Sequence, residues 1–184
     1  GITPPQMRKL LKFIGNHADD AGNLQGWWDR FTLQPLHKDT INLYAVADWI
    51  IKPFTAKTTS SYVELVVDEG TVEQCPRWFI SHWWGEPVRD FIAAVEAHVE
   101  ARGHDESSAY WVCAYANNQH ELGNDIDKDP RKTSFYRAMS HCIGVLLILD
   151  ANATPFTRAW CCFEEAMVVR DDQRKGPPLI LDIA

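Results

Sequence analysis

The run Trp160-Cys161-Cys162-Phe163-Glu164 holds the residues with the clearest chemical potential in this chain of 184 residues. It follows an apolar run at 143–149 and opens a stretch with helical spacing. Residues four apart are neighbours on one face of a helix, so Trp160 and Glu164 are expected to lie together. An indole can hold a flat cationic ring while the carboxylate reaches the atom beside it. Glu164 is therefore the candidate catalytic residue. Two alternatives stay open, an exposed helix carboxylate for Glu164 and a core position for Trp160.

Composition and charge limit the classes of partner. Hydrophobic residues make up 46% of the chain and charged residues 23%, as in ordinary folded proteins. The formal net charge is −7 and the basic residues are scattered, which disfavours a nucleic acid or an anionic membrane as partner. The five cysteines show no disulfide spacing, and no apolar run is long enough for a signal peptide or membrane span. We expect a reduced, cytoplasmic protein that is a piece of a longer chain.

The N-terminal part is predicted to be mainly helical. Thr3-Pro4-Pro5-Gln6 has the composition of a helix start, with a hydroxyl cap, proline in the first turn and Gln at the third position. A second start at Asp39-Thr40 precedes an apolar stripe that ends at Pro53. Residues 26–28 are expected to form a short helix or a loop, and residues 62–67 a strand. Residues 1–72 are thus predicted to be a helical extension packed on the core.

From residue 77 onward, apolar strand patterns alternate with helical ones. Strands are expected at 78–81, 110–115, 143–149 and after 178, and helices at 87–103, 134–142 and 157–170. This alternation is typical of a parallel sheet covered on both faces. We predict an α/β fold for residues 73–184, with a flavodoxin-like parallel sheet of four to five strands flanked by helices.

Two boxes in this part resemble Toll/interleukin-1 receptor (TIR) domains. Phe79-Ile80-Ser81-His82, followed by Gly85-Glu86, resembles the first box of that family. Trp160-Cys161-x-x-Glu164, after the lead-in Thr157-Arg158, resembles the Trp-Cys-x-x-Glu box of plant and microbial members. The boxes occur in the order of the family and do not extend to residues 1–72. The chain departs from the pattern in its inserted Trp83-Trp84 and in having four recognisable strands where a TIR domain has five.

The resemblance implies a function. Some TIR domains cleave NAD at the nicotinamide–ribose bond and use the Glu of the Trp-Cys box, which is Glu164 here, with Trp160 near the nicotinamide. Breaking a bond to a pyridinium builds oxocarbenium character on the ribose, which a carboxylate stabilises, and the neutral leaving group needs no proton. NAD is then the substrate, and no further cofactor is expected. A homo-oligomer acting in signalling or immunity is also implied. The alternative is a TIR-like scaffold that signals by self-association without chemistry.

Further substrate-binding residues are expected where strands end. With strands in the order 2-1-3-4, ligands bind beyond the carboxyl ends of the first and third strands. At least one of the adjacent indoles in the first box should line a groove. Amides that follow the second strand can bind ribose hydroxyls or a carboxamide. The predicted binding residues besides Trp160 are Ser81, His82, Trp83, Trp84, Asn117, Asn118, Gln119 and Asp150.

The polar segment 117–132 has two further interpretations. Its length and its amides predict a mobile flap over the site. Asp125, Asp127 and Asp129 begin like a calcium loop, but Pro130 stands where such a loop needs glycine. No metal site is therefore expected.

Overall fold

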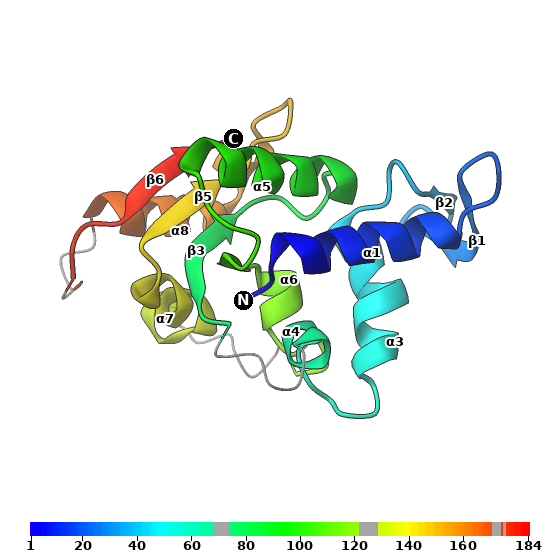
Figure 1. Ribbon diagram of the computed structural model, residues 1–184, viewed down its shortest axis with the longest axis horizontal. Helices are drawn as coiled ribbons and strands as arrows, with labels where there is room; N and C mark the ends of the chain where they lie inside the picture. The colour runs from blue at the N-terminus through cyan, green and yellow to red at the C-terminus, as the bar shows by residue number, and fades with distance from the viewer. Residues whose placement is uncertain (68–73, 122–128, 171–173, 175) are drawn as a thin grey trace.

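A four-stranded parallel sheet forms the centre of the computed structural model, which describes residues 1–67, 74–121, 129–170, 174 and 176–184 (Figure 1). The strands are β3 (Pro76–Ser81), β4 (Ala109–Trp111), β5 (Gly144–Leu147) and β6 (Ile180–Ile183). They lie in the order β4-β3-β5-β6, and each neighbouring pair is parallel. The predicted parallel sheet and its order 2-1-3-4 are confirmed.

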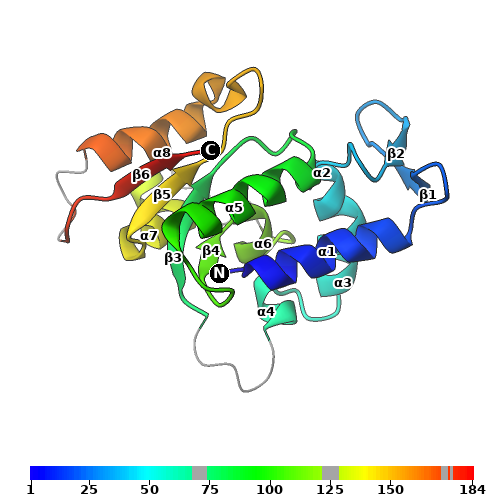
Figure 2. The ribbon, with the colours of Figure 1, turned by 45° about the horizontal axis from the view of Figure 1, so that its top comes forward.

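Helices cover both faces of this sheet (Figure 2). They are α5 (Val88–Arg102), α6 (Cys113–Ala116), α7 (Ser134–His141) and α8 (Ala159–Arg170), with 3₁₀ turns η3 (Pro130–Lys132) and η4 (Thr154–Thr157). Alternate strand residues face opposite layers. Trp78 and Ile80 belong to the cluster that includes α5, whereas Phe79 and Val145 belong to the cluster of α7 and α8. Phe79 and Leu147 lie buried on the adjacent central strands β3 and β5, as predicted.

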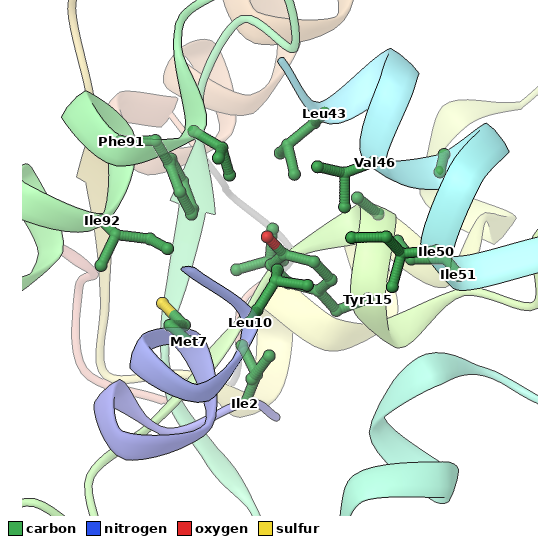
Figure 3. Close-up of a cluster of buried hydrophobic side chains, with 14 of the residues drawn as sticks. Ile2, Met7, Leu10, Leu43, Val46, Ile50, Ile51, Phe91, Ile92 and Tyr115 are labelled. Atoms are coloured by element: carbon green, nitrogen blue, oxygen red, sulfur yellow. The ribbon is translucent and has the colours of Figure 1, made fainter. Parts of the chain in front are cut away.

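The N-terminal part packs on the α5 side of the sheet. Its elements are α1 (Pro4–Asn16), β1 (Asn23–Trp28), β2 (Pro35–His37), α2 (Leu43–Val46), the π-helical turn η1 (Ala47–Ile51), α3 (Lys52–Thr55) and α4 (Tyr62–Val66). Helix α1 begins with the predicted capping box of Thr3 and Gln6. Figure 3 shows Met7 and Leu10 of α1 and Val46 of α2 pointing toward Phe91 of α5 and toward Tyr115. Among the described residues, no helix is both long and apolar enough to cross a membrane.

Three local predictions were wrong. Residues 62–66 form a helix because Ser61 and Glu64 make a capping box, in which the Glu64 carboxylate accepts from the Ser61 N–H at 2.7 Å. Residues 26–28 belong to β1, which pairs with β2 in an antiparallel hairpin. The strand expected at 110–115 ends at Trp111, and α6 begins two residues later. A six-residue apolar run does not distinguish a buried strand from a strand followed by a buried helical turn.

Candidate functional site

A pocket of about 240 Å³ lies beyond the carboxyl ends of β3 and β4. Four aromatic side chains line it: Tyr44, Trp84, Phe135 and Trp160. Its polar and titratable lining comes from Glu164, His82 and Arg158, and from two thiols. The pocket thus combines flat apolar surfaces with one carboxyl group and one guanidinium group.

Helix α8 carries Glu164 into this pocket. Only 5% of Glu164 is exposed, which excludes the alternative of an exposed helix carboxylate. It has no ion-pair partner among the described residues. Burial raises the pKa of Glu164 to about 8; the neighbouring Ser81 hydroxyl works against this rise and the negative charge of Glu165 adds to it. The Ser81 oxygen is itself buried and makes no hydrogen bond of standard geometry within the described structure. Glu164 is therefore mainly in its neutral form at pH 7 unless a cation binds beside it.

Trp160 lies at the mouth of the pocket, one helical turn before Glu164. It is 41% exposed, so it is not a core residue. Its indole stacks on Phe135 of α7, with ring centres 5.7 Å apart and planes inclined by 20°. Phe163 meets the indole edge-on at 6.2 Å. Because neighbouring rings hold Trp160 in place, it can act as a platform for a flat ligand.

His82 follows β3 and is fixed by a buried carboxylate. Its Nδ1 lies 3.2 Å from Glu86 Oε1, and the ring packs against Phe91 at 4.6 Å. The other ring nitrogen, Nε2, is buried without a partner in the part of the chain that the structure describes. His82 thus contributes to the pocket wall an imidazole whose position depends on Glu86.

The adjacent indoles of Trp83 and Trp84 line different hollows. Trp84 lines the pocket of Glu164 and donates from Nε1 to Cys113 Sγ at 3.0 Å. Trp83 and Asp150 line a second hollow of about 350 Å³, beyond the ends of β3 and β5. Asp150 accepts there from the Thr154 N–H and hydroxyl, both at 2.6 Å. The crevice expected from the strand order is therefore present, but Glu164 does not line it.

The three amides after β4 do not line the pocket, and two of them bind backbone. Gln119 is 6% exposed and donates from Nε2 to the carbonyls of Cys113 and Ala114 at 3.2 and 3.1 Å. Asn118 donates to the carbonyl of Thr59 at 2.7 Å. Asn117 is buried as well, and its Nδ2 makes no hydrogen bond to the described residues. The contacts of Asn118 and Gln119 show that these two amides support the backbone. The flap prediction concerns mainly residues 122–128, which lie outside the described residues.

The thiols in the pocket are not set up as nucleophiles. Burial raises the pKa of Cys113 to about 12 and that of Cys161 to about 11, so both are neutral at physiological pH. Among the described residues, no group of three or more His, Cys, Asp or Glu side chains could hold a metal ion. Neutral thiols therefore serve as polarizable parts of the wall.

Sequence reasoning missed several lining residues, among them Tyr44, Phe135, Cys113 and Arg158. Arg158 lies just before the Trp-Cys box and was noted only as part of its lead-in, although a free guanidinium beside a candidate acid is a signal in itself. Tyr44 lies in the N-terminal part, far from Arg158 in the sequence, at a place that no local pattern marks as functional. Its role follows only from the packing of α2 against the loop after β3.

Comparison with known proteins identifies no relative. No protein-family model matches the chain, and no curated protein and no solved structure matches it significantly.

Proposed function

We propose that this protein is a TIR-like enzyme that breaks the nicotinamide–ribose bond of NAD or a related nucleotide. The observation that carries the proposal is the buried carboxyl group of Glu164, which lines an aromatic pocket and has no ion-pair partner among the described residues. Pockets for drug-sized ligands have volumes of about 300–1,000 Å³. The pocket of about 240 Å³ therefore suits one ring system, with the rest of a dinucleotide outside it. The resemblance of both boxes to those of TIR domains supports the same function.

The pyridinium ring of NAD matches the chemistry of this pocket. Aromatic faces attract a cation, and Trp160 and Tyr44 are such side chains. A positive ring beside Glu164 also favours the ionised carboxylate, so it lowers the pKa that burial has raised. Binding of the cation is then coupled to release of a proton from Glu164. Binding of the pyridinium ring thus produces the ionised Glu164 carboxylate that the reaction needs.

In the reaction, the bond between the pyridinium nitrogen and ribose C1′ breaks, and its electron pair goes to the nitrogen. Nicotinamide leaves as a neutral molecule while the ribose gains oxocarbenium character. The Glu164 carboxylate stabilises this positive charge. Water adds to C1′ and loses a proton, which gives ADP-ribose. If a nucleophile within the nucleotide adds instead of water, the product is cyclic.

Arg158 is suited to the diphosphate of such a substrate. It lines the pocket, and no ion-pair partner holds its guanidinium within the described chain. Guanidinium groups bind phosphate through charge-assisted hydrogen bonds. The second hollow contains Glu86, Asp90 and Asp150 instead, whose carboxylates repel phosphate. We therefore propose that the bound nucleotide extends out of the pocket with its diphosphate beside Arg158.

Incubation of the purified protein with NAD tests this function. We expect free nicotinamide in amounts equal to ADP-ribose or its cyclic form, measured by liquid chromatography with mass detection. The assay is run over a range of protein concentrations, because TIR-like enzymes are expected to work as homo-oligomers. Absence of nicotinamide release at every concentration contradicts the proposal.

A TIR-like scaffold without chemistry is the second candidate, and the outer edge of β6 offers the surface that such a scaffold needs. β6 has no neighbouring strand on that side within the described residues, and it exposes Ile180, Leu181 and Ile183. A free strand edge with apolar side chains can pair with another chain. Self-association through this edge is compatible with both candidates. Sedimentation of the wild type and of Ile183→Lys tests it, with a lower association constant expected for the variant.

We further propose a cytoplasmic location. Cys113, Cys142 and Cys161 are partly or fully buried and form no disulfide. Unpaired thiols of this kind are common in proteins of reducing compartments.

A further inference from the structure

Tyr44 is the one pocket residue contributed by the N-terminal part among those that the structure describes. Backbone hydrogen bonds fix its position. The Leu43 N–H donates to the Trp84 carbonyl at 3.0 Å, and the Val88 N–H donates to the Ile41 carbonyl at 2.8 Å. The segment that carries Tyr44 is thus attached on both sides to the loop between β3 and α5.

Neighbouring rings also hold the Tyr44 side chain. Its ring centre lies 5.4 Å from that of Trp84, with the planes inclined by 52°. Phe31, from the turn of the β1–β2 hairpin, meets Tyr44 edge-on at 6.1 Å. Trp84 is itself anchored through its hydrogen bond to Cys113 Sγ. Tyr44 therefore cannot swing away from the pocket without breaking contacts on both of its sides.

We propose that Tyr44 determines the ring specificity of the pocket, by acting as a wall that limits the pocket it shares with Glu164 to a single six-membered cationic ring. This inference rests on the proposed function, because it assumes that a cationic ring enters the pocket. It goes beyond that function because Tyr44 belongs to residues 1–72, outside the segment that resembles TIR domains. The N-terminal part then selects the substrate in addition to packing on the sheet.

Two model cations test the inference without any turnover. 1-Methylnicotinamide carries one ring and 1-methylquinolinium carries two fused rings. We expect calorimetric titration of the wild type to give a preference of at least about tenfold for the single ring, the scale of discrimination that pocket shape can supply. In Tyr44→Ala this preference should disappear or reverse, because truncation opens space for the second ring. Tyr44→Phe, which keeps the ring and removes only the hydroxyl, should keep the preference.

Phe54→Ala is the matched control. Phe54 is also an aromatic residue of the N-terminal part, is 51% exposed and packs on Phe13, and it does not line the pocket. Its removal should leave the ratio of the two affinities unchanged. If Tyr44→Ala fails to fold, Tyr44→Trp tests the inference instead, because a larger ring should weaken binding of both cations. Unchanged binding in Tyr44→Trp overturns the inference.

The outcomes separate this inference from the proposed function. Nicotinamide release by the wild type together with an unaltered ratio in Tyr44→Ala overturns only the role of Tyr44. A wild type that binds neither cation overturns both. Loss of the preference in Tyr44→Phe as well as in Tyr44→Ala contradicts the argument from size and points to the hydroxyl.

Discussion

Glu164 is deeply buried and has no oppositely charged partner in the part of the chain that the structure describes, and both features affect its ionisation. An exposed glutamate is ionised at pH 7, whereas the pKa of Glu164 is raised to about 8 by burial. The proposed chemistry uses the carboxylate. In the free protein at neutral pH, only a minor fraction of the molecules holds that form. Activity should therefore depend on pH in a range where most glutamates no longer titrate.

We expect kcat/KM for NAD to rise with pH and to level off above an apparent pKa near 8. The ratio kcat/KM reports ionisations of the free enzyme, so its pH profile should follow Glu164 before the cation binds. Below this pKa the rise should approach tenfold per pH unit, because the active fraction is proportional to the ionised fraction. Initial rates from pH 5.5 to 9.5 check this. A kcat/KM that falls as the pH passes 8 would mean that the neutral acid is the working form.

Replacing the charge itself gives a second test at Glu164. Glu164→Gln keeps the shape and removes the negative charge, so turnover should fall at least about a hundredfold, roughly 2.7 kcal/mol of barrier. Glu165→Gln is the matched control. Glu165 is the next residue on α8, points about 100° away around the helix and does not line the pocket. Equal losses in both variants would indicate a general effect on α8 instead of a role in the reaction.

The same burial has a consequence for stability. The pKa of Glu164 lies at about 8 in the folded protein and at its ordinary value of 4.5 in the unfolded chain. Between these values the folded state holds a proton that the unfolded state has released. The wild-type free energy of unfolding should thus be highest below pH 4.5 for this group and fall as the pH rises to about 8, by at most ~1.4 kcal/mol per pH unit.

In Glu164→Gln the side chain cannot ionise, so the free energy of unfolding of the variant does not fall with pH for this reason. Relative to the wild type, the variant should be close to neutral at pH 5 and clearly more stable at pH 8 and above. Urea unfolding at pH 5, 7 and 9 measures the difference. A difference that stays constant over this range would show that Glu164 does not change its proton affinity on folding.

At the scale of elements, capping explains where the sequence reasoning failed. Residues 62–66 include an aromatic and two β-branched side chains, a composition that suggests a strand. The Ser61 hydroxyl nevertheless accepts from the Glu64 N–H at 3.3 Å, and a helix begins there. The same kind of box at Thr3 and Gln6 is easier to recognise, because prolines stand in the first turn of that helix. A capping box is thus a stronger local signal than the β propensity of the residues that follow it. The β1–β2 hairpin could not be predicted from a turn motif. Its loop, residues 29–34, contains no glycine and is longer than the two-residue turns that give the clearest sequence signal.

The cap at Ser61 can be tested directly. Ser61→Ala removes the acceptor for the first turn of α4 and should lower the free energy of unfolding by about 0.5–2 kcal/mol. Ser60→Ala is the control, because the Ser60 hydroxyl contacts only Thr58 Oγ1 at an exposed position and its loss should stay within about 0.5 kcal/mol. Chemical unfolding of both variants checks the difference. Equal stability of the two variants would contradict the role of the cap.

At the scale of the whole molecule, the alternating pattern after residue 77 sufficed to predict the sheet and its order, because parallel strands with short crossovers allow few arrangements. The two boxes, and not this alternation, indicated Glu164, Trp160, Trp84 and His82, which share one pocket. The other predicted binding residues do not line that pocket. Contacts between distant segments were not predictable in this way. Tyr44 reaches the pocket, and Gln119 turns toward backbone, for reasons that depend on packing in three dimensions. No periodicity in a single sequence records such contacts.

A network of this long-range kind attaches the last strand to α5. Asp182 of β6 accepts from His98 Nε2 at 2.9 Å and from Arg102 Nε at 2.7 Å, and the other nitrogen of His98 lies 2.9 Å from the Tyr110 hydroxyl. His98 is 6% exposed. The Arg102 guanidinium, and after it His98, hold the pKa of Asp182 below its ordinary value of 3.8. The ionised carboxylate is therefore the form that joins these segments.

Asp182→Ala should leave His98 and Tyr110 without the acceptor that completes their network, at a cost on the order of 1–3 kcal/mol in the free energy of unfolding at pH 7. A depressed carboxyl pKa contributes stability above the unfolded value, which is lost as the pH falls through the folded one. The difference between variant and wild type should accordingly shrink below about pH 4. Glu100→Ala, an exposed change on the same helix, should stay within about 0.5 kcal/mol. Hydrogen exchange should show faster opening of the β6 amides in Asp182→Ala; protection equal to that of the wild type would mean that backbone pairing with β5 alone holds the strand.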